Sequence, residues 1–269
     1  MPFVTKSTLF LWGCGGPALF PLQQLADISV SLLQTQHFSV IPLIKPSARV
    51  INSTGTDILV LAVLILLSSL TLMNASSVVD TARDVYYAWQ ISDGRHFPMQ
   101  GPNVGRVFHG GPVWFYLLAV PLIFSSSWLV MSLWVGLLAA LKYGLAYACG
   151  SRLADRNLGL AWACLLALPD WTAINTLIFS HTSLVETSLL FCLLCLIQWQ
   201  QLRSNAWFLA LCLGIGLGIH AHPTVYATGL LALPFVIRSL WRRELSLWML
   251  PAGGLVALIP FVPYLIYQG

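Results

Sequence analysis

The chain has 269 residues, of which 58% are hydrophobic and only 8% are charged, and its mean hydropathy is +0.80. Ordinary soluble domains carry about 25% charged residues, so this composition excludes them and indicates a polytopic integral membrane protein. The net charge of +4 comes from Lys and Arg residues beside apolar runs. That pattern is typical of topology signals and argues against a nucleic-acid surface.

Residues 1–56 differ from the rest of the chain. Their apolar runs are short and broken by glycine, so they predict neither a good span nor a signal peptide with a small-residue cleavage site. We expect an N-terminal extension that is cytoplasmic or interfacial, followed by a transmembrane region over residues 57–269.

The transmembrane region contains apolar runs of two lengths. A spanning helix needs about 20 apolar residues, which predicts clear spans at 58–78, 128–150, 158–178, 183–200 and 246–267. Two shorter runs, 206–220 and 224–238, flank the polar sequence HAHP and bring the expected total to about seven. The run 113–124 contains Pro121 and is too short to cross comfortably, so we expect it at the membrane interface.

Positive charges decide the orientation, because Lys and Arg are enriched in short cytoplasmic loops. The basic residues of the later turns are Arg152, Arg156, Arg203, Arg238, Arg242 and Arg243. If 113–124 does not cross, all these turns become cytoplasmic and the segment 80–112 becomes a large external first loop with juxtamembrane helices. If it crosses, they become external. We adopt the first option, which predicts a multi-pass protein of the plasma or inner membrane.

The same topology groups the histidines. The turns at 180–182 and 220–223 fall on the external side, together with the loop 80–112. We therefore expect His181, His220 and His222 to line a cavity beside this loop, at the depth of a lipid head group.

Two acidic residues open the loop. Asp80 and Asp84 are one helical turn apart, so they share a face if 80–92 is a helix. A partly desolvated carboxylate there can accept a proton from an attacking hydroxyl group. The alternative is that Asp80 simply caps or solvates a helix end.

Basic residues follow in the same loop. Arg95, Arg106 and His109 are candidates for binding phosphate, through the guanidinium fork or the imidazole. Basic residues at an interface also bind ordinary lipid head groups, and both interpretations stay open.

Two features within the later spans carry weaker signals. Glu186 lies in an apolar helix, where an acid is costly and faces a bundle interior or a polar pocket. His220 and His222 without a firm third ligand give a weak zinc signal, so we assign no metal site, although a divalent metal stays open as a cofactor. Cys192 and Cys195 lie in FCLLCL, which predicts helix packing because redox and zinc motifs need accessible thiolates.

The order of these elements resembles a known family. An aspartate follows the first span, a helical stretch ends in DGRHFP, and a GP-containing loop leads to HGGPVWFY and back into the membrane. This order resembles the GT-C type glycosyltransferases that use polyprenyl-phosphate sugars, namely the protein mannosyltransferase and aminoarabinose transferase-like enzymes. The resemblance covers residues 57–269.

The resemblance implies an inverting transfer of a hexosyl or pentosyl group from a polyprenyl-phosphate donor to a lipid, glycan or protein acceptor on the external face. It implies that Asp80 is the catalytic carboxylate, with Asp84 as second choice. It also implies that His109 contacts the donor phosphate, with Arg106 and Arg95 nearby, in a place where relatives often have Lys. The turns at His181 and His222 match regions that line the donor cavity.

Family members continue beyond the point that corresponds to PFVPYLIYQG, so the resemblance implies that this chain is an N-terminal fragment whose cavity is completed by later helices. Two other functions stay open. One is a lipid or anion transporter or flippase, with Glu186 and the histidines along its path. The other is a non-catalytic, truncated membrane subunit.

Overall fold

The computed structural model describes residues 54–71, 79–104, 108–109, 111–168 and 179–268. They belong to one unit, Ile44–Gly269, and the predicted extension over 1–56 lies almost wholly outside the described residues. Within these ranges the fold is all-helical, as predicted, apart from one two-residue antiparallel ladder. The elements are α2 (Gly55–Thr71), α3 (Val79–Ser92), β1 (Asn103–Val104), β2 (Phe108–His109), α4 (Val113–Leu122), α5 (Trp128–Leu153), α6 (Arg156–Leu166), η2 (His181–Leu184), α8 (Val185–Leu202), α9 (Asn205–Ala221), η3 (Pro223–Val225), α10 (Tyr226–Trp241), α11 (Met249–Leu258), η4 (Ile259–Phe261) and α12 (Val262–Gln268).

Four helical stretches of the described chain are long and apolar enough to cross a membrane. They are Trp128–Leu153, His181–Leu202, Pro223–Trp241 and Met249–Tyr267. Three shorter apolar helices accompany them, at Gly55–Thr71, Val113–Leu122 and Asn205–Ala221. The predicted spans 58–78 and 158–178 run into residues outside the described ranges. Membrane-spanning character therefore agrees with the sequence, while the total of seven spans stays a prediction.

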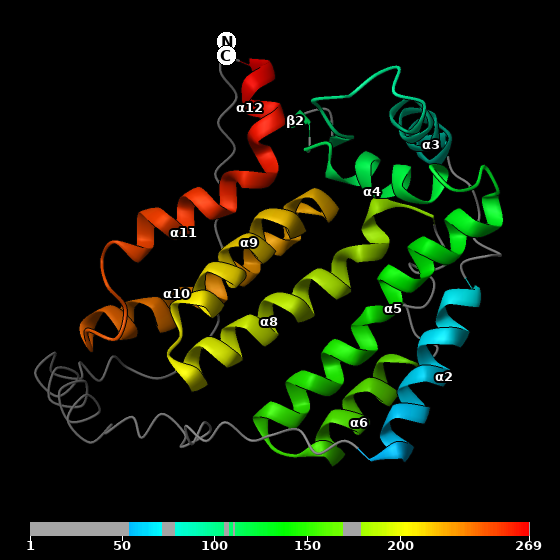
Figure 1. The fold of residues 1–269 in the computed structure, drawn as a ribbon. Coiled ribbons are helices and arrows are strands. Elements are labelled where there is room, and N and C mark those ends of the chain that lie inside the picture. The colour runs from blue at the N-terminus through cyan, green and yellow to red at the C-terminus, as the bar shows by residue number, and fades with distance from the viewer. Residues whose placement is uncertain (1–53, 72–78, 105–107, 110, 169–178, 269) are drawn as a thin grey trace, which may run out of the picture. The chain divides into compact units, whose positions relative to one another are not determined.

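Helix α5 occupies the centre of the packing, because it contacts α2, α6 and α8 (Figure 1). Helix α8 in turn packs against α9, and α9 packs against α11. A capping box starts α2, in which the Thr54 hydroxyl donates to the Asp57 carboxylate at 3.0 Å and the Thr54 amide donates to it at 3.2 Å. The same carboxylate, 1% exposed, accepts a 2.9 Å hydrogen bond from the Tyr147 hydroxyl and so joins α2 to α5.

The basic turns after α5, α8 and α10 lie at one end of the bundle (Figure 1). Two contacts join them: Gln201 donates to the Arg152 carbonyl at 2.7 Å, and Arg203 Nη1 lies 2.7 Å from the Glu244 carboxylate. The predicted orientation depends on these basic turns sharing one side of the membrane. The assignment of this end to the cytoplasm stays a prediction.

Helices α3 and α4 pack against each other at the opposite end (Figure 1). The buried side chains of α4 include Trp114, Phe115 and Leu118, and they form a cluster with Ala88 of α3 and Phe179. Helix α4 has only ten residues, about 15 Å at 1.5 Å per residue, which is half the thickness of a bilayer core. This length is consistent with the predicted interfacial position of the run 113–124.

Candidate functional site

Asp80 and Asp84 lie on one face of α3, since the segment 80–92 is helical as the sequence predicted. Arg83 connects them: its guanidinium lies 3.0 Å from the Asp80 carboxylate, and its Nη2 and Nε donate to Asp84 at 2.7 and 2.9 Å. The two acids differ in exposure, because the Asp80 side chain is 61% exposed and Asp84 is 1% exposed. Asp80 is therefore the accessible carboxylate, whereas the buried Asp84 carboxylate fixes the position of the Arg83 guanidinium by accepting its hydrogen bonds.

Asp84 also fixes the position of α4. Its second oxygen accepts a 2.8 Å hydrogen bond from the indole N–H of Trp114, the tryptophan of the HGGPVWFY segment. Burial raises the pKa of the Asp84 carboxyl above its ordinary value, the hydrogen bonds from Arg83 and Trp114 act against that shift, and the nearby charge of Asp80 adds to it. Two charge-assisted bonds from Arg83 and one from Trp114 satisfy the buried group.

The first histidine turn meets this cluster. The His181 ring stands edge-on to Trp114 with ring centroids 6.3 Å apart, and the Thr81 hydroxyl donates to the carbonyl of Phe179 at 2.9 Å. Asp80 and Arg83 lie within electrostatic range of His181. Residues about a hundred positions apart in sequence therefore lie close together at this end of the bundle.

His222 belongs to the same end of the bundle and lies within electrostatic range of His181. Its Nδ1 accepts the backbone N–H of Thr224 at 3.2 Å and so caps the turn η3. A ring whose Nδ1 accepts this bond carries its proton on Nε2 when neutral, which makes His222 a hydrogen-bond donor.

His220 supports the loop 80–112 from α9. Its buried ring packs against Phe261 with centroids 4.5 Å apart, and it fills the space beside Gly111 that a side chain would otherwise occupy. His220 is therefore placed by packing between the loop and α9.

This close approach makes Gly111 sensitive to substitution. A methyl group at position 111 would overlap the His220 imidazole, and forced overpacking typically costs about 1–3 kcal/mol. We expect Gly111→Ala to lower the apparent melting temperature in detergent by several degrees. Gly254→Ala is the matched control, since its added methyl group would meet nothing within 4 Å. Equal melting curves for both variants would contradict the contact.

Glu186 has a partner that the sequence analysis missed. Lys142 of α5, only 2% exposed, places its Nζ 2.5 Å from the Glu186 carboxylate of α8. Next to this pair, the Thr187 hydroxyl donates to the carbonyls of Leu138 and Ala139. The sequence placed Glu186 either in the bundle interior or at a polar pocket, and as a candidate cavity residue; its contact with Lys142 forms a polar connection between α5 and α8, and a role in lining the cavity stays a prediction.

The predicted phosphate contacts are described only in part. Arg106 lies outside the described residues, and for His109 the structure describes the backbone alone, paired with Asn103. Arg95 contacts residues close to it in sequence: its guanidinium lies 3.2 Å from the Asp93 carboxylate and 4.8 Å from the centre of the Trp89 ring. Arg95 is thus engaged away from the acidic pair.

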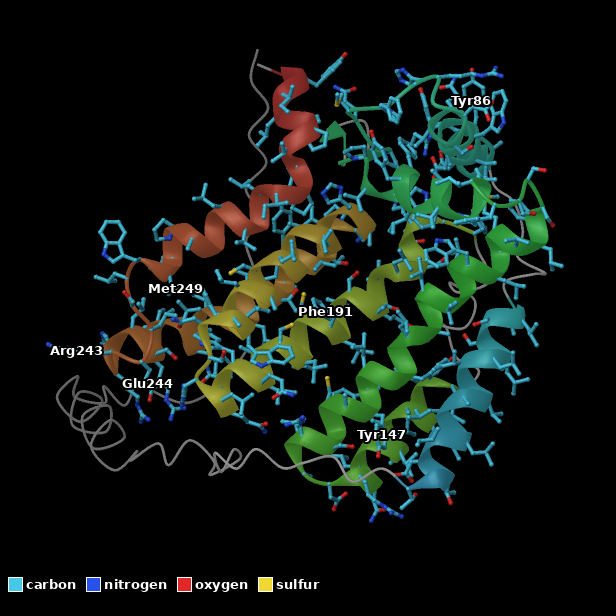
Figure 2. The ribbon with its side chains drawn as sticks, viewed as in Figure 1. Tyr86, Tyr147, Phe191, Arg243, Glu244 and Met249 are labelled. Atoms are coloured by element: carbon cyan, nitrogen blue, oxygen red, sulfur yellow. The ribbon has the colours of Figure 1, made fainter. Side chains whose placement is uncertain are left out.

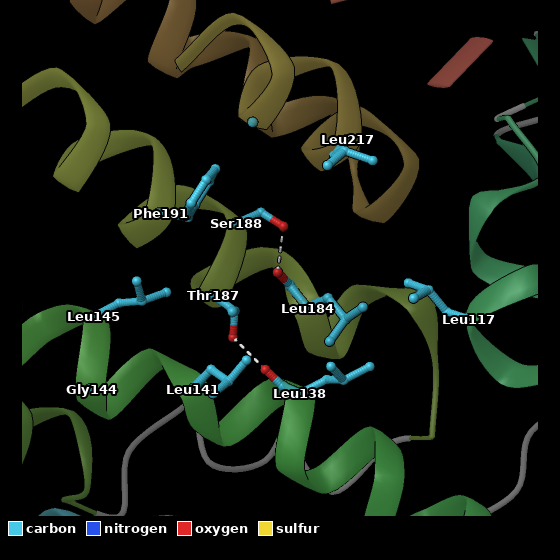
Figure 3. A pocket seen from close by; sticks show the side chains of 11 residues that line it. Leu117, Leu138, Leu141, Gly144, Leu145, Leu184, Thr187, Ser188, Phe191 and Leu217 are labelled. Atoms are coloured by element: carbon cyan, nitrogen blue, oxygen red, sulfur yellow. Dashed lines mark hydrogen bonds between the residues drawn. The ribbon is translucent and has the colours of Figure 1, made fainter. Parts of the chain in front are cut away.

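An apolar groove lies between helices of the bundle (Figure 3). Its volume is about 390 Å³, and side chains from α4, η2, α5, α8 and α9 line it. The lining residues are Leu117, Leu138, Leu141, Gly144, Leu145, Leu184, Thr187, Ser188, Phe191, Gly214 and Leu217. The hydroxyl groups of Thr187 and Ser188 both donate to backbone carbonyls, so the wall presents almost no free polar group. Leu184 and Leu117 each follow one turn after a cluster residue, His181 and Trp114 respectively.

A second cavity, of about 340 Å³, borders Arg83. Its walls combine a cationic group, an imidazole and aromatic rings with loop backbone. They comprise Arg83, Tyr87, His96, Phe97, Pro98, Met99, Gln100, Gly101, Pro102, Phe115 and Tyr267. Both cavities fall in the size range of small-molecule sites. Among the described residues no group of three His, Cys, Asp or Glu side chains is placed to hold a metal ion.

Comparisons of the chain with protein-family models, with curated proteins and with solved structures found no match. The geometry of the site must therefore support any function on its own. Three of the residues described above received no role from the sequence: Arg83, Trp114 and Lys142. For Trp114 a signal existed, because an indole in an otherwise apolar interfacial helix needs a hydrogen-bond acceptor when it is buried.

Proposed function

We propose that the protein is a membrane glycosyltransferase that moves a sugar from a polyprenyl-phosphate donor to an acceptor hydroxyl group. One observation carries the proposal: an apolar groove begins one helical turn from a cluster of charged and imidazole side chains. A ligand that fits both parts has a long hydrocarbon tail and a polar, charged head. The resemblance of the loop 80–112 to GT-C enzymes supports the same class of donor.

In the proposed reaction, an acceptor oxygen attacks the anomeric carbon of the sugar from the face opposite the phosphate. The new bond joins that oxygen to carbon, and the bond between the anomeric carbon and the phosphate oxygen breaks, so that the lipid phosphate leaves with the electron pair. The acceptor proton passes to Asp80, the exposed carboxylate. Inversion at the anomeric carbon follows from this single displacement.

The remaining residues have assigned roles in the proposal. Arg83 orients Asp80 and borders the second cavity, whose aromatic and polar walls suit a sugar ring. Arg106 and His109 contact the donor phosphate, and His181 and His222 donate hydrogen bonds to its head group. Asp84 holds Arg83 and Trp114 in place and does not contact the substrate.

The groove gives the proposal a direct test. Gly144 lines the groove, and a Cβ added there would meet no atom within 4 Å, so the side chain of Gly144→Trp starts in open space and occupies the groove. We expect the KM for a long-chain polyprenyl-phosphate sugar to rise at least tenfold, and the KM for a donor with a short prenyl chain to change less. Gly254→Trp is the control, because Gly254 also faces open space but lies outside the groove. An unchanged long-chain KM in Gly144→Trp would count against the groove as the tail site.

The Lys142–Glu186 pair favours one alternative, a lipid or anion transporter, because ionisable residues inside transmembrane helices often mark transport paths. The two functions differ in what happens to the donor. A transferase consumes it and releases lipid phosphate, whereas a flippase moves it intact between leaflets. Movement of intact donor across proteoliposomes without release of lipid phosphate would favour the transporter.

A further inference from the structure

A second lipid-sized groove lies on α10. It has a volume of about 580 Å³ and is lined by Leu230, Leu233, Pro234, Ile237, Arg238, Trp241 and Arg242. The residues from 230 to 242 cover twelve helical steps, about 18 Å along the axis. The groove is apolar over most of this length and becomes cationic at the end where α10 meets the basic turns.

The apolar wall is open to its surroundings. Leu230 is 73% exposed and Trp241 is 89% exposed. Indole side chains collect at the level of lipid head groups, and Trp241 together with Trp248, which is also exposed, marks that level beside the groove. A hydrocarbon chain along Leu230, Leu233 and Ile237 would therefore end at the head-group region.

The positive charge of the turn between α10 and α11 is not neutralised by acidic side chains of the same turn. Glu244 is the only acidic residue of the sequence after Glu186. Its carboxylate lies 2.7 Å from Arg203 Nη1, so it is already engaged by the end of α8. Figure 2 places Glu244 at the turn between α10 and α11, together with Arg243. Within the described ranges no acidic side chain forms an ion pair with Arg238 or Arg242, so both guanidinium groups are available to a ligand in the groove.

We propose that this groove binds an anionic phospholipid, with one acyl chain along α10 and its phosphate at Arg238 and Arg242. The apolar wall of the groove fits a hydrocarbon chain, and the two arginines at one end fit a negatively charged head group. Because basic residues near the membrane surface attract anionic lipids, the groove should prefer an anionic lipid to a zwitterionic one. The site lies at the end of the bundle opposite to Asp80, so it is independent of the proposed transferase site.

The test measures lipid selectivity in the intact chain. The purified protein is reconstituted in phosphatidylcholine vesicles with trace spin-labelled phosphatidylglycerol or spin-labelled phosphatidylcholine, and the immobilised fraction gives their relative association constants. An arginine placed beside the lipid phosphate contributes roughly a fivefold preference for anionic lipid. We expect the wild-type protein to prefer phosphatidylglycerol, and the double variant Arg238→Gln with Arg242→Gln to lose at least fivefold of that preference.

Arg243→Gln is the matched control, because it removes the same charge from the same turn at a residue outside the groove. We expect it to keep the preference within twofold. An equal loss in Arg243→Gln would show diffuse attraction and overturn the site, as would the absence of any preference in the wild type. A groove covered by a second copy of the chain, detected as a cross-linked dimer without lipid preference, would also overturn it. Helical circular dichroism of each variant excludes loss of folding as the cause.

Discussion

Asp80→Asn is expected to reduce sugar transfer by about 10²- to 10⁴-fold, the range that a positioned general base contributes. The amide keeps the size of the carboxylate but accepts no proton at neutral pH. Because the Asp80 side chain is largely exposed and, among the described residues, forms its ion pair with Arg83, its replacement should leave insertion and folding intact. Initial rates with a radiolabelled polyprenyl-phosphate sugar measure the effect, and the melting temperature verifies the fold.

The loop provides a matched control for this substitution. Asp93 is also a carboxylate of the loop 80–112 and also pairs with an arginine, since it lies 3.2 Å from Arg95. Asp93→Asn therefore removes the same charge from the same loop at a place outside the cluster, and we expect the transfer rate to stay within twofold. Retained transfer in Asp80→Asn, or an equal loss in both variants, would refute the role of Asp80 as base.

Lys142→Met is expected to destabilise the bundle strongly. Removing one member of a buried pair leaves the other charge uncompensated, and such changes cost about 3–5 kcal/mol. The Glu186 side chain is 26% exposed, so the lower value, about 3 kcal/mol, is the better expectation. For a chain of this size that corresponds to a fall of about 10 °C in melting temperature.

A double-mutant cycle separates the pair from its individual groups. Lys142→Met combined with Glu186→Leu removes both charges, and we expect it to recover most of the lost stability because two unpaired charges are no longer buried. Additive losses in the double variant would mean that the two side chains do not interact. If the pair mainly holds α8 against α5, the double variant should also keep the KM for the donor.

The sequence predicted the helical class and the division into two ends because both depend on local signals. Apolar runs of spanning length and arginines at alternate turns are visible in the chain itself, and the structure brings Arg152, Arg203 and Glu244 to one end. The spacing of Asp80 and Asp84 placed them on one face on the condition that 80–92 is a helix, and the structure meets that condition.

The partners of individual side chains could not be read in the same way. Nothing local distinguishes exposed Asp80 from buried Asp84, because the difference arises when α4 packs against α3 and Trp114 reaches the second carboxylate. Lys142 was overlooked for a related reason: a single lysine within an apolar run gives no sign of its partner, which lies 44 residues later in the sequence. The sequence therefore gave no sign that Glu186 contacts α5.

The proposed transfer can be tested most directly by the fate of the donor. The purified chain in proteoliposomes is incubated with a polyprenyl-phosphate sugar labelled in the sugar and with a membrane lipid and glycan extract as the source of acceptor hydroxyl groups, and free polyprenyl phosphate and labelled acceptor are measured together. We expect equal amounts of both products, with inverted configuration at the anomeric carbon, and at least about 10²-fold less of each from Asp80→Asn. Release of the same amount of polyprenyl phosphate by the wild type, by Asp80→Asn and by empty liposomes would contradict it.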